Sequence, residues 1–253
     1  MRISFVGPRR GVVLPTIRGE RKGFSPVADK GRKKISTDAV KAWLGDGFTT
    51  ALQKQQPLAL KTVERLRRVH KNESPEQLLT RLNRYYVTSV TASGTGAGAA
   101  AVVPNGAVQL PVAMADFATF LELSILYVLS TAEIYGVDVE DHERRRFLVL
   151  TALLGNSGTS TVTQALGKKT VPYWSKTIVN SIPMDAIKAA NKVLGPRFIT
   201  KYGTKQGLLV LGKQLPLALG AAVGAGGNAT FGYFVIRSTK RLLGDPPVTW
   251  GEK

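Results

Sequence analysis

Cysteine is absent from the 253-residue sequence, and histidine occurs only at His70 and His142. Without cysteine the chain cannot form disulfides, thiolate zinc sites or iron–sulfur clusters, and it has no thiol nucleophile. The two histidines lie far apart in sequence, and neither has a carboxylate at ligand spacing. We therefore expect no metal site and no histidine-based catalytic triad.

Acidic residues are also scarce, because 17 Asp and Glu stand against 35 Lys and Arg, which gives a formal net charge of +18. Residues 1–35 hold ten basic and two acidic residues, and residues 144–253 hold sixteen basic and three acidic ones. Between them, residues 85–143 contain seven acidic residues and no Lys or Arg. The basic excess predicts an acidic partner, which is nucleic acid, an anionic lipid surface or an acidic protein.

Residues 1–35 combine glycine and proline with scattered basic residues and show no sustained apolar period. Such a segment cannot bury enough apolar surface to offset its ordering entropy, so we predict a disordered basic arm that ends in Arg32, Lys33 and Lys34. A solvated tail without a partner is the alternative. The apolar runs in this segment are too short for a secretory signal, so we expect the protein in the cytosol.

Three helices are predicted within residues 36–86. Ser36 is a start signal, and apolar residues follow it at three- and four-residue spacing through Leu52. A second helix is predicted from Pro57, because proline fits a first helical turn. The third begins at Ser74-Pro75-Glu76-Gln77, which has the pattern of a capping box with proline at the first helical position.

Residues 85–115 carry no charge, and three glycines alternate with other residues in Gly94-Thr95-Gly96-Ala97-Gly98. A strand that leads into a phosphate-binding loop is one interpretation, but the glycine spacing departs from GxGxxG and no series of strands follows. Small residues also let helices approach closely, and this interpretation fits the composition better. We therefore expect a glycine-packed helical hairpin near 85–137.

A long helix is predicted over 111–135, in which Glu122 and Glu133 lie within roughly 20° of one face. The next helix is predicted to begin near Asp138–Asp141 and to end at Gly155. Its start carries Arg144, Arg145 and Arg146.

Antiparallel packing of these two helices would bring the three arginines beside Glu133, so we predict a buried structural ion pair among Glu122, Glu133 and the arginines. An enzyme that uses Glu122 and Glu133 as paired carboxylates is the alternative. It requires both acids to face an open cleft, and no nucleophile or metal-ligand set accompanies them in the sequence.

Short helices are predicted beyond Gly155 at about 171–182, 184–194 and 204–213, the second of them stopped by Gly195-Pro196. Within the last, residues 207–213 spell GxxxxGK. Gln214 replaces the Ser or Thr that a phosphate-binding loop requires, so this motif does not indicate an NTPase.

Residues 214–236 are uncharged, and as a helix they would extend roughly 34 Å, enough to cross a bilayer core. Their glycine content lowers hydropathy and helix propensity, which favours an interior glycine-packed helix or a re-entrant hairpin over a simple span. Small residues predicted to pack against a neighbouring helix are Gly220, Gly224, Gly227 and Asn228. Basic residues that follow directly, as at the cytosolic end of a membrane segment, are Arg237, Lys240 and Arg241.

Three stretches together resemble the bacterial EcsC family: the Gly/Ala-rich block 88–104, the segment FLELSILYVLSTAEIYGVDVEDHERRRFLVLTALLG at 120–155, and LPLALGAAVGAGGNATFGYFVIRSTKRLL at 215–243. The similarity runs from about residue 74 to residue 243 and leaves the basic arm outside it. It implies a mostly helical, membrane-associated protein with no established catalytic residues and no cofactor.

The sequence thus predicts an all-α helical bundle with glycine-rich apolar helical hairpins near 85–137 and 204–243. The expected organisation is a disordered arm (1–35), a single helical EcsC-like domain (36–244) and a short tail (245–253). We expect a non-enzymatic protein on the cytosolic side of a bacterial membrane, peripheral or partly inserted. Its predicted partner is anionic membrane lipid or a membrane protein, with an accessory role in transport or envelope processes. A basic nucleic-acid-binding protein is the alternative.

Overall fold

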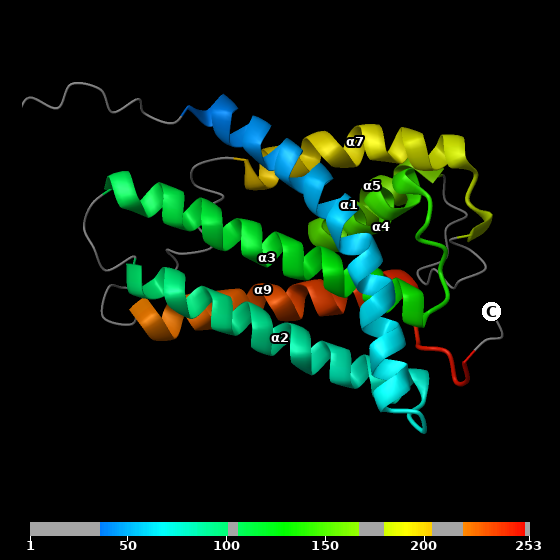
Figure 1. The fold of residues 1–253 in the computed structure, drawn as a ribbon. Coiled ribbons are helices and arrows are strands. Elements are labelled where there is room, and N and C mark those ends of the chain that lie inside the picture. Colours follow the sequence, from blue (N-terminus) through cyan, green and yellow to red (C-terminus); the bar gives the residue numbers. More distant parts are fainter. Residues whose placement is uncertain (1–35, 101–105, 167–179, 204–219, 251–253) are drawn as a thin grey trace, which may run out of the picture. The chain divides into compact units, whose positions relative to one another are not determined.

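Helices make up all the regular structure in residues 36–100, 106–166, 180–203 and 220–250, which are the residues that the computed structural model describes (Figure 1). They are α1 (Thr37–Val69), α2 (Pro75–Ala100), α3 (Gly106–Ile134), α4 (His142–Leu154), α5 (Asn156–Leu166), α7 (Met184–Tyr202) and α9 (Gly220–Leu243). The predicted all-α class is therefore confirmed. The basic arm, the helix at 204–213 and most of the one at 171–182 fall outside the described residues.

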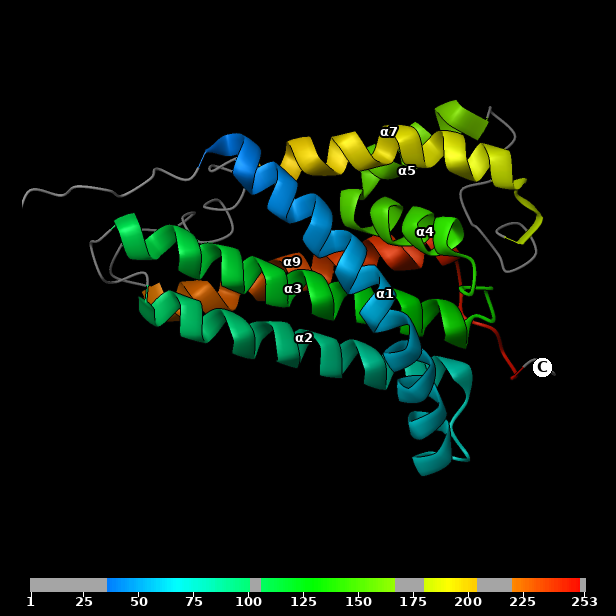
Figure 2. The same ribbon diagram turned by 45° about the horizontal axis from the view of Figure 1, so that its top comes forward.

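The helices form two groups that α1 links. Helices α2, α3 and α9 lie side by side, and α4, α5 and α7 pack on one another (Figures 1 and 2). Helix α1 crosses α3 and also contacts α7, while α4 contacts both α3 and α9. In both views α2 runs antiparallel to α3 and to α9, so the Ala100 end of α2 lies at the same end as the beginnings of the other two.

Local capping explains where the helices begin. The Ser36 hydroxyl accepts a hydrogen bond from the Ala39 amide at 3.1 Å, as predicted for an N-cap. Ser74 and Gln77 form the predicted capping box, in which the Ser74 amide donates to Gln77 Oε1 at 2.8 Å and the Gln77 amide donates to Ser74 Oγ at 3.3 Å. Helix α4 has Asp141 as its N-cap, and it ends at the predicted Gly155, whose φ of 63° favours glycine.

The prediction of two helices on either side of Pro57 is wrong, because α1 continues through this proline. Proline removes one backbone donor from the helix interior. The loss is offset because apolar residues on both sides of it, such as Leu52 and Ala59, are fully buried in the same core.

The predicted stop at Gly195-Pro196 is also wrong, since α7 runs from Met184 to Tyr202 with Pro196 inside it. Leu194 and Phe198, which flank the pair, are buried, and their packing holds the helix together across the proline.

Helix α5 was not predicted, because its sequence NSGTSTVTQAL lacks an apolar period. Its threonine hydroxyls bond to backbone oxygens four residues earlier, for example from Thr161 to Ser157 at 2.7 Å.

Tyrosines connect the helices of the core. The rings of Tyr86 on α2 and Tyr127 on α3 stack with their centroids 4.4 Å apart, and the Tyr86 hydroxyl bonds to Ser124 Oγ at 2.7 Å. Tyr127 donates to Asn83 Oδ1 at 2.7 Å. Tyr135 donates to the backbone oxygen of Gly244 at 2.9 Å and so anchors the end of α9 to the end of α3. These side chains are buried structural groups and offer no stacking surface.

Candidate functional site

One face of α9 carries exposed aromatic and basic side chains, among which the Phe234 ring also lies against Gly155 and Lys201. The exposed residues follow one another at spacings of one and three residues, which places them on a single helical stripe. They are Thr230, Tyr233, Phe234, Arg237, Lys240 and Arg241. Large aromatic side chains are unusual on a solvated helix face, and here Tyr233 is 62% and Phe234 37% exposed. We call Tyr233, Phe234, Arg237, Lys240 and Arg241 the α9 stripe.

The three basic residues predicted on this segment are therefore all exposed. Arg241 Nη1 donates to Asn156 Oδ1 at 2.7 Å, and this bond ties the stripe to the start of α5. Lys201 on α7 adds a fourth cation, since its Nζ lies 5.2 Å from the centre of the Phe234 ring. Burial lowers the pKa of Lys201 from its ordinary value. The other predicted lipid-binding residues, Arg32, Lys33 and Lys34, lie outside the described residues.

Glycine allows α9 to approach α2 closely. A Cβ atom added to Gly232 would lie 2.9 Å from Val90 Cγ2 and 3.7 Å from Tyr86 Cε1. Because the two helices are antiparallel (Figure 1), the contact of Gly232 with Val90 and Tyr86 puts Tyr85 of α2 near the level of Tyr233 of α9. Tyr85 is 49% exposed, and the exposed Arg84 precedes it. Two neighbouring helices thus carry an exposed tyrosine at one level, followed by a basic residue in the same direction.

Beyond this tyrosine level α2 and α9 carry no charge, whereas α3 still carries Glu122 and Asp116. No charged residue occurs in α2 after Arg84, in α3 before Asp116 or in α9 before Arg237. Figures 1 and 2 show the end of α2 at the same end of the group as the beginnings of α3 and α9. At a rise of about 1.5 Å per residue, the stretch of α9 from Asn228, which contacts Asp116, back to Gly220 is about 12 Å long. We call the parts of α2, α3 and α9 beyond Asp116 and Asn228 the uncharged end.

Asp116 and Asn228 mark the inner limit of the uncharged end. Asn228 is 2% exposed, and its Nδ2 donates to Asp116 Oδ1 at 3.3 Å. Burial raises the pKa of Asp116, and the bond from Asn228 opposes this effect. Asn228 was predicted to help pack helices, and the structure places it in a polar contact between α9 and α3.

The other predicted packing residues, Gly220, Gly224 and Gly227, lie in the part of α9 whose surroundings the structure does not describe. Gly232, which makes the close contact with α2, was missed. The signal was present in the sequence, because Gly220, Gly224, Asn228 and Gly232 follow one another at four-residue spacing.

The three arginines that were predicted to cluster have different surroundings. Arg144 is buried. Arg145 Nη1 donates to the backbone oxygens of Val139 and Glu140 at 2.9 and 2.7 Å. Burial lowers the pKa of Arg145. Arg146 turns toward α1 and α7 and lines a pocket there.

The two glutamates that were expected to pair with these arginines differ in exposure, since Glu122 is exposed and Glu133 is half-buried. The pairing of Glu133 with the arginines stays a prediction. Among the residues that the structure describes, no three His, Asp or Glu side chains gather in a way that could hold a metal ion.

Helix α3 contains a segment, Ala113–Ile134, that is long and apolar enough to cross a membrane. However, 67% of its most apolar window is buried by the other helices. A core helix of a water-soluble protein has the same character, so this segment alone is weak evidence for a membrane span.

Comparison of the chain with models of protein families, with curated proteins and with solved structures gives no significant match. The similarity to the EcsC family therefore stays a prediction from the sequence.

Proposed function

We propose that this protein binds the anionic surface of a bacterial membrane from the cytosolic side, as a non-enzymatic accessory to transport or envelope processes. One observation carries the proposal: along α9 an uncharged stretch is followed by exposed Tyr233 and Phe234 and then by Arg237, Lys240 and Arg241. Proteins at a bilayer interface use this order, because aromatic rings sit at the headgroup level and basic residues lie on the cytosolic side of them.

The neighbouring helix supports the same orientation. Tyr85 and Arg84 of α2 lie near the level of Tyr233 and repeat the aromatic-to-basic order, so two helices would meet the headgroups together. The membrane surface would lie at the three exposed aromatic residues, with the uncharged end beyond it. Similarity to the EcsC family points to the same class of protein.

The length of the uncharged end sets its depth in a bilayer. A projection of about 12 Å is shorter than a hydrocarbon core of about 30 Å. It would therefore enter one leaflet and would not cross the membrane. The small residues of the uncharged end bury little apolar area, so much of the affinity would come from the basic residues. Each basic residue at the surface contributes about 1 kcal/mol toward anionic lipid.

Sedimentation with lipid vesicles tests the proposal. The test variant combines Arg237→Gln, Lys240→Gln and Arg241→Gln. The matched control combines Lys54→Gln, Lys61→Gln and Arg65→Gln, which removes the same charge from exposed positions on α1. On vesicles that contain phosphatidylglycerol we expect the test variant to bind up to about a hundredfold more weakly than wild type, and the control to bind much closer to wild type.

Equal binding of the two variants would show that net charge alone attracts the protein and would remove the role of the α9 stripe. Failure of the wild-type protein to bind anionic vesicles at low salt would end the proposal. Binding to phosphatidylcholine vesicles should be weaker at every protein concentration, because these carry no net charge.

Nucleic acid is the alternative partner, because exposed Tyr233 and Phe234 beside basic residues could also stack on unpaired bases. Phosphate contacts make the affinity for nucleic acid fall steeply with salt. A gel-shift titration at several salt concentrations separates the two. A salt-sensitive shift that the α9 variant loses, together with no binding to vesicles, would favour nucleic acid.

A further inference from the structure

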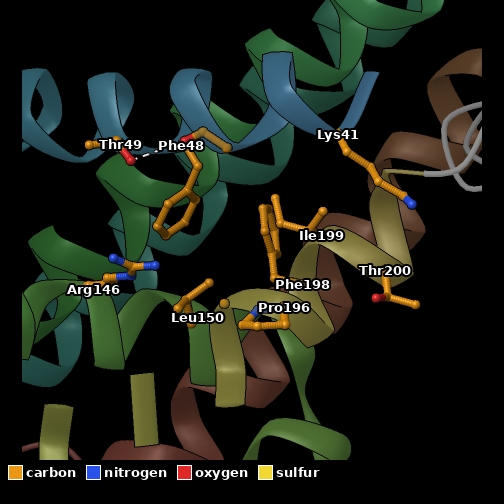
Figure 3. A pocket seen from close by; sticks show the side chains of 11 residues that line it. Lys41, Phe48, Thr49, Arg146, Leu150, Pro196, Phe198, Ile199 and Thr200 are labelled. Carbon is orange, nitrogen blue, oxygen red and sulfur yellow. Dashed lines mark hydrogen bonds between the residues drawn. The ribbon is translucent and has the colours of Figure 1, made fainter. Parts of the chain in front are cut away.

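A pocket lies between α1, α4 and α7 (Figure 3), and none of the five residues of the α9 stripe lines it. Its volume is about 460 Å³, within the range of about 300–1,000 Å³ that is typical of small-molecule sites. Most of its wall is apolar and comes from Phe48, Leu150, Pro196, Phe198 and Ile199. Within the part of the chain that the structure describes, no Asp or Glu side chain lines it.

Arg146 supplies the principal charge of this pocket. Figure 3 shows its guanidinium beside Phe48 and Leu150, whereas the amino group of Lys41 lies at the opposite side and turns away. Lys41 pairs instead with Asp38 at 3.7 Å. Arg146 Nε is buried and has no hydrogen-bond partner among the residues that the structure describes. Since Nε is closed off, a ligand in the pocket would meet the outer guanidinium nitrogens, of which Nη2 lies near Gly195 in the pocket wall.

Glycine at position 195 leaves room for the guanidinium. A Cβ atom added to Gly195 would lie 3.0 Å from Arg146 Nη2. Gly195 lies inside α7, where glycine is less favourable than other residues. A larger residue at position 195 would therefore press on the Arg146 guanidinium.

We propose that this pocket binds a small organic anion with an apolar body, such as a medium-chain carboxylate. The carboxylate accepts hydrogen bonds from Arg146, whose planar fork matches two oxygens. The aliphatic or aromatic body packs on Phe48, Leu150 and Phe198. This site is separate from the membrane-binding face, so the two proposals can fail independently.

Calorimetric titration with octanoate tests the ligand class. Octanol lacks the charge, so comparison with it measures the contribution of the carboxylate. Acetate lacks the apolar body, so comparison with it measures the contribution of the chain. We expect octanoate to bind at least about tenfold more tightly than octanol, since a hydrogen bond to a charged group is worth about that factor. We expect the same margin over acetate, which lacks the methylene groups that the apolar wall would bury. Absence of octanoate binding, or equal binding of octanol, would overturn the proposal.

Two variants locate the site. Arg146→Met keeps an unbranched apolar stem but removes the guanidinium and its charge, and it should weaken octanoate binding by about tenfold or more. Gly45→Leu narrows the pocket and retains Arg146. Gly45 lines the pocket, and a Cβ atom there meets Ile199 Cδ1 at an unstrained 3.8 Å. Leucine also favours the helix more than glycine does, so this variant should fold and lose binding.

Gly47→Leu is the matched control, because Gly47 also lies in α1, has open space around its Cα and does not line the pocket. It should bind octanoate as the wild type does. If Gly45→Leu binds octanoate with unchanged affinity, the ligand occupies another site and the proposal is wrong.

Discussion

Asn228 of α9 donates a hydrogen bond to Asp116 of α3, and this contact joins the first charged residue of α3 to a buried amide of α9. Every residue of α3 before Asp116 and of α9 before Asn228 is uncharged. The pair therefore separates the uncharged end from the part of the protein that carries the charges. A carboxylate in this position is costly to bury, and the bond from Asn228 offsets part of the cost.

Replacement of Asp116 by Asn should raise the free energy of unfolding at neutral pH. Burial raises the pKa of Asp116, so the folded carboxyl holds its proton more tightly than the unfolded carboxyl, whose pKa is about 3.9. The stability from this group is therefore complete below that pH and is lost as pH rises through the folded pKa.

Because Asp116 is only half-buried and solvent screens its charge, we expect a gain of no more than about 1 kcal/mol from Asp116→Asn at pH 7. The Asn228 amide keeps an oxygen acceptor in this variant. Urea unfolding of both proteins at acid and neutral pH measures the effect. The difference between them should grow from pH 4 to pH 7, and a constant difference would contradict the burial of this carboxylate.

The close contact between α2 and α9 should tolerate no large side chain at Gly232. A leucine there would press on Val90, which is stiff because it is β-branched, and the two helices would have to separate. We expect Gly232→Leu to lower the free energy of unfolding by about 2 kcal/mol. Gly47→Leu, in open space on α1, should leave it unchanged or raise it, and equal stabilities of the two variants would refute the contact.

The helix starts were predictable from sequence because capping is local. Ser36, Ser74 and Asp141 each bond to an amide three residues later, so a window of four residues contains the whole signal. The continuation of α1 through Pro57 and of α7 through Pro196 was not predictable in this way. Proline acts as a breaker in any local interpretation, and the packing that overrides it comes from other helices.

For the candidate sites, too, features set by neighbouring residues in the chain were predictable, and features set by contacts between distant helices were not. The basic residues of the α9 stripe were predictable because they follow the uncharged stretch directly in the chain. The exposure of Tyr85 and Tyr233 at one level was not predictable, since it depends on the register of α2 against α9 that Gly232 sets. The pocket was missed altogether, because α1, α4 and α7 contribute to it from distant parts of the sequence.

Alkaline pH should unfold the protein through its buried tyrosines. Burial raises the pKa of Tyr86, Tyr127 and Tyr202 well above their ordinary value and that of Tyr135 to about 12. Stability from these groups is complete below the unfolded pKa of about 10 and is lost as pH rises through the folded values. Free energies of unfolding measured from pH 8 to 11 should fall above about pH 10.

The double variant Tyr86→Phe and Tyr127→Phe provides the control for this loss. It gives up two hydrogen bonds at neutral pH, each worth about 1 kcal/mol, but two fewer hydroxyls titrate. Its stability should therefore decline less steeply above pH 10 than that of the wild type. A decline of equal slope would assign the effect to other groups.

Fluorescence from a single labelled cysteine on α2 tests most directly whether the uncharged end enters the bilayer. The chain has no cysteine, so Ser89→Cys, at an exposed position beyond Tyr85, can carry an environment-sensitive dye without background. Ala42→Cys on the exposed face of α1 is the control. We predict that phosphatidylglycerol vesicles shift the emission at position 89 to the blue and expose it to lipid-borne quenchers, with neither effect at position 42. Unchanged, unquenched emission at position 89, while the protein sediments with the vesicles, would contradict insertion.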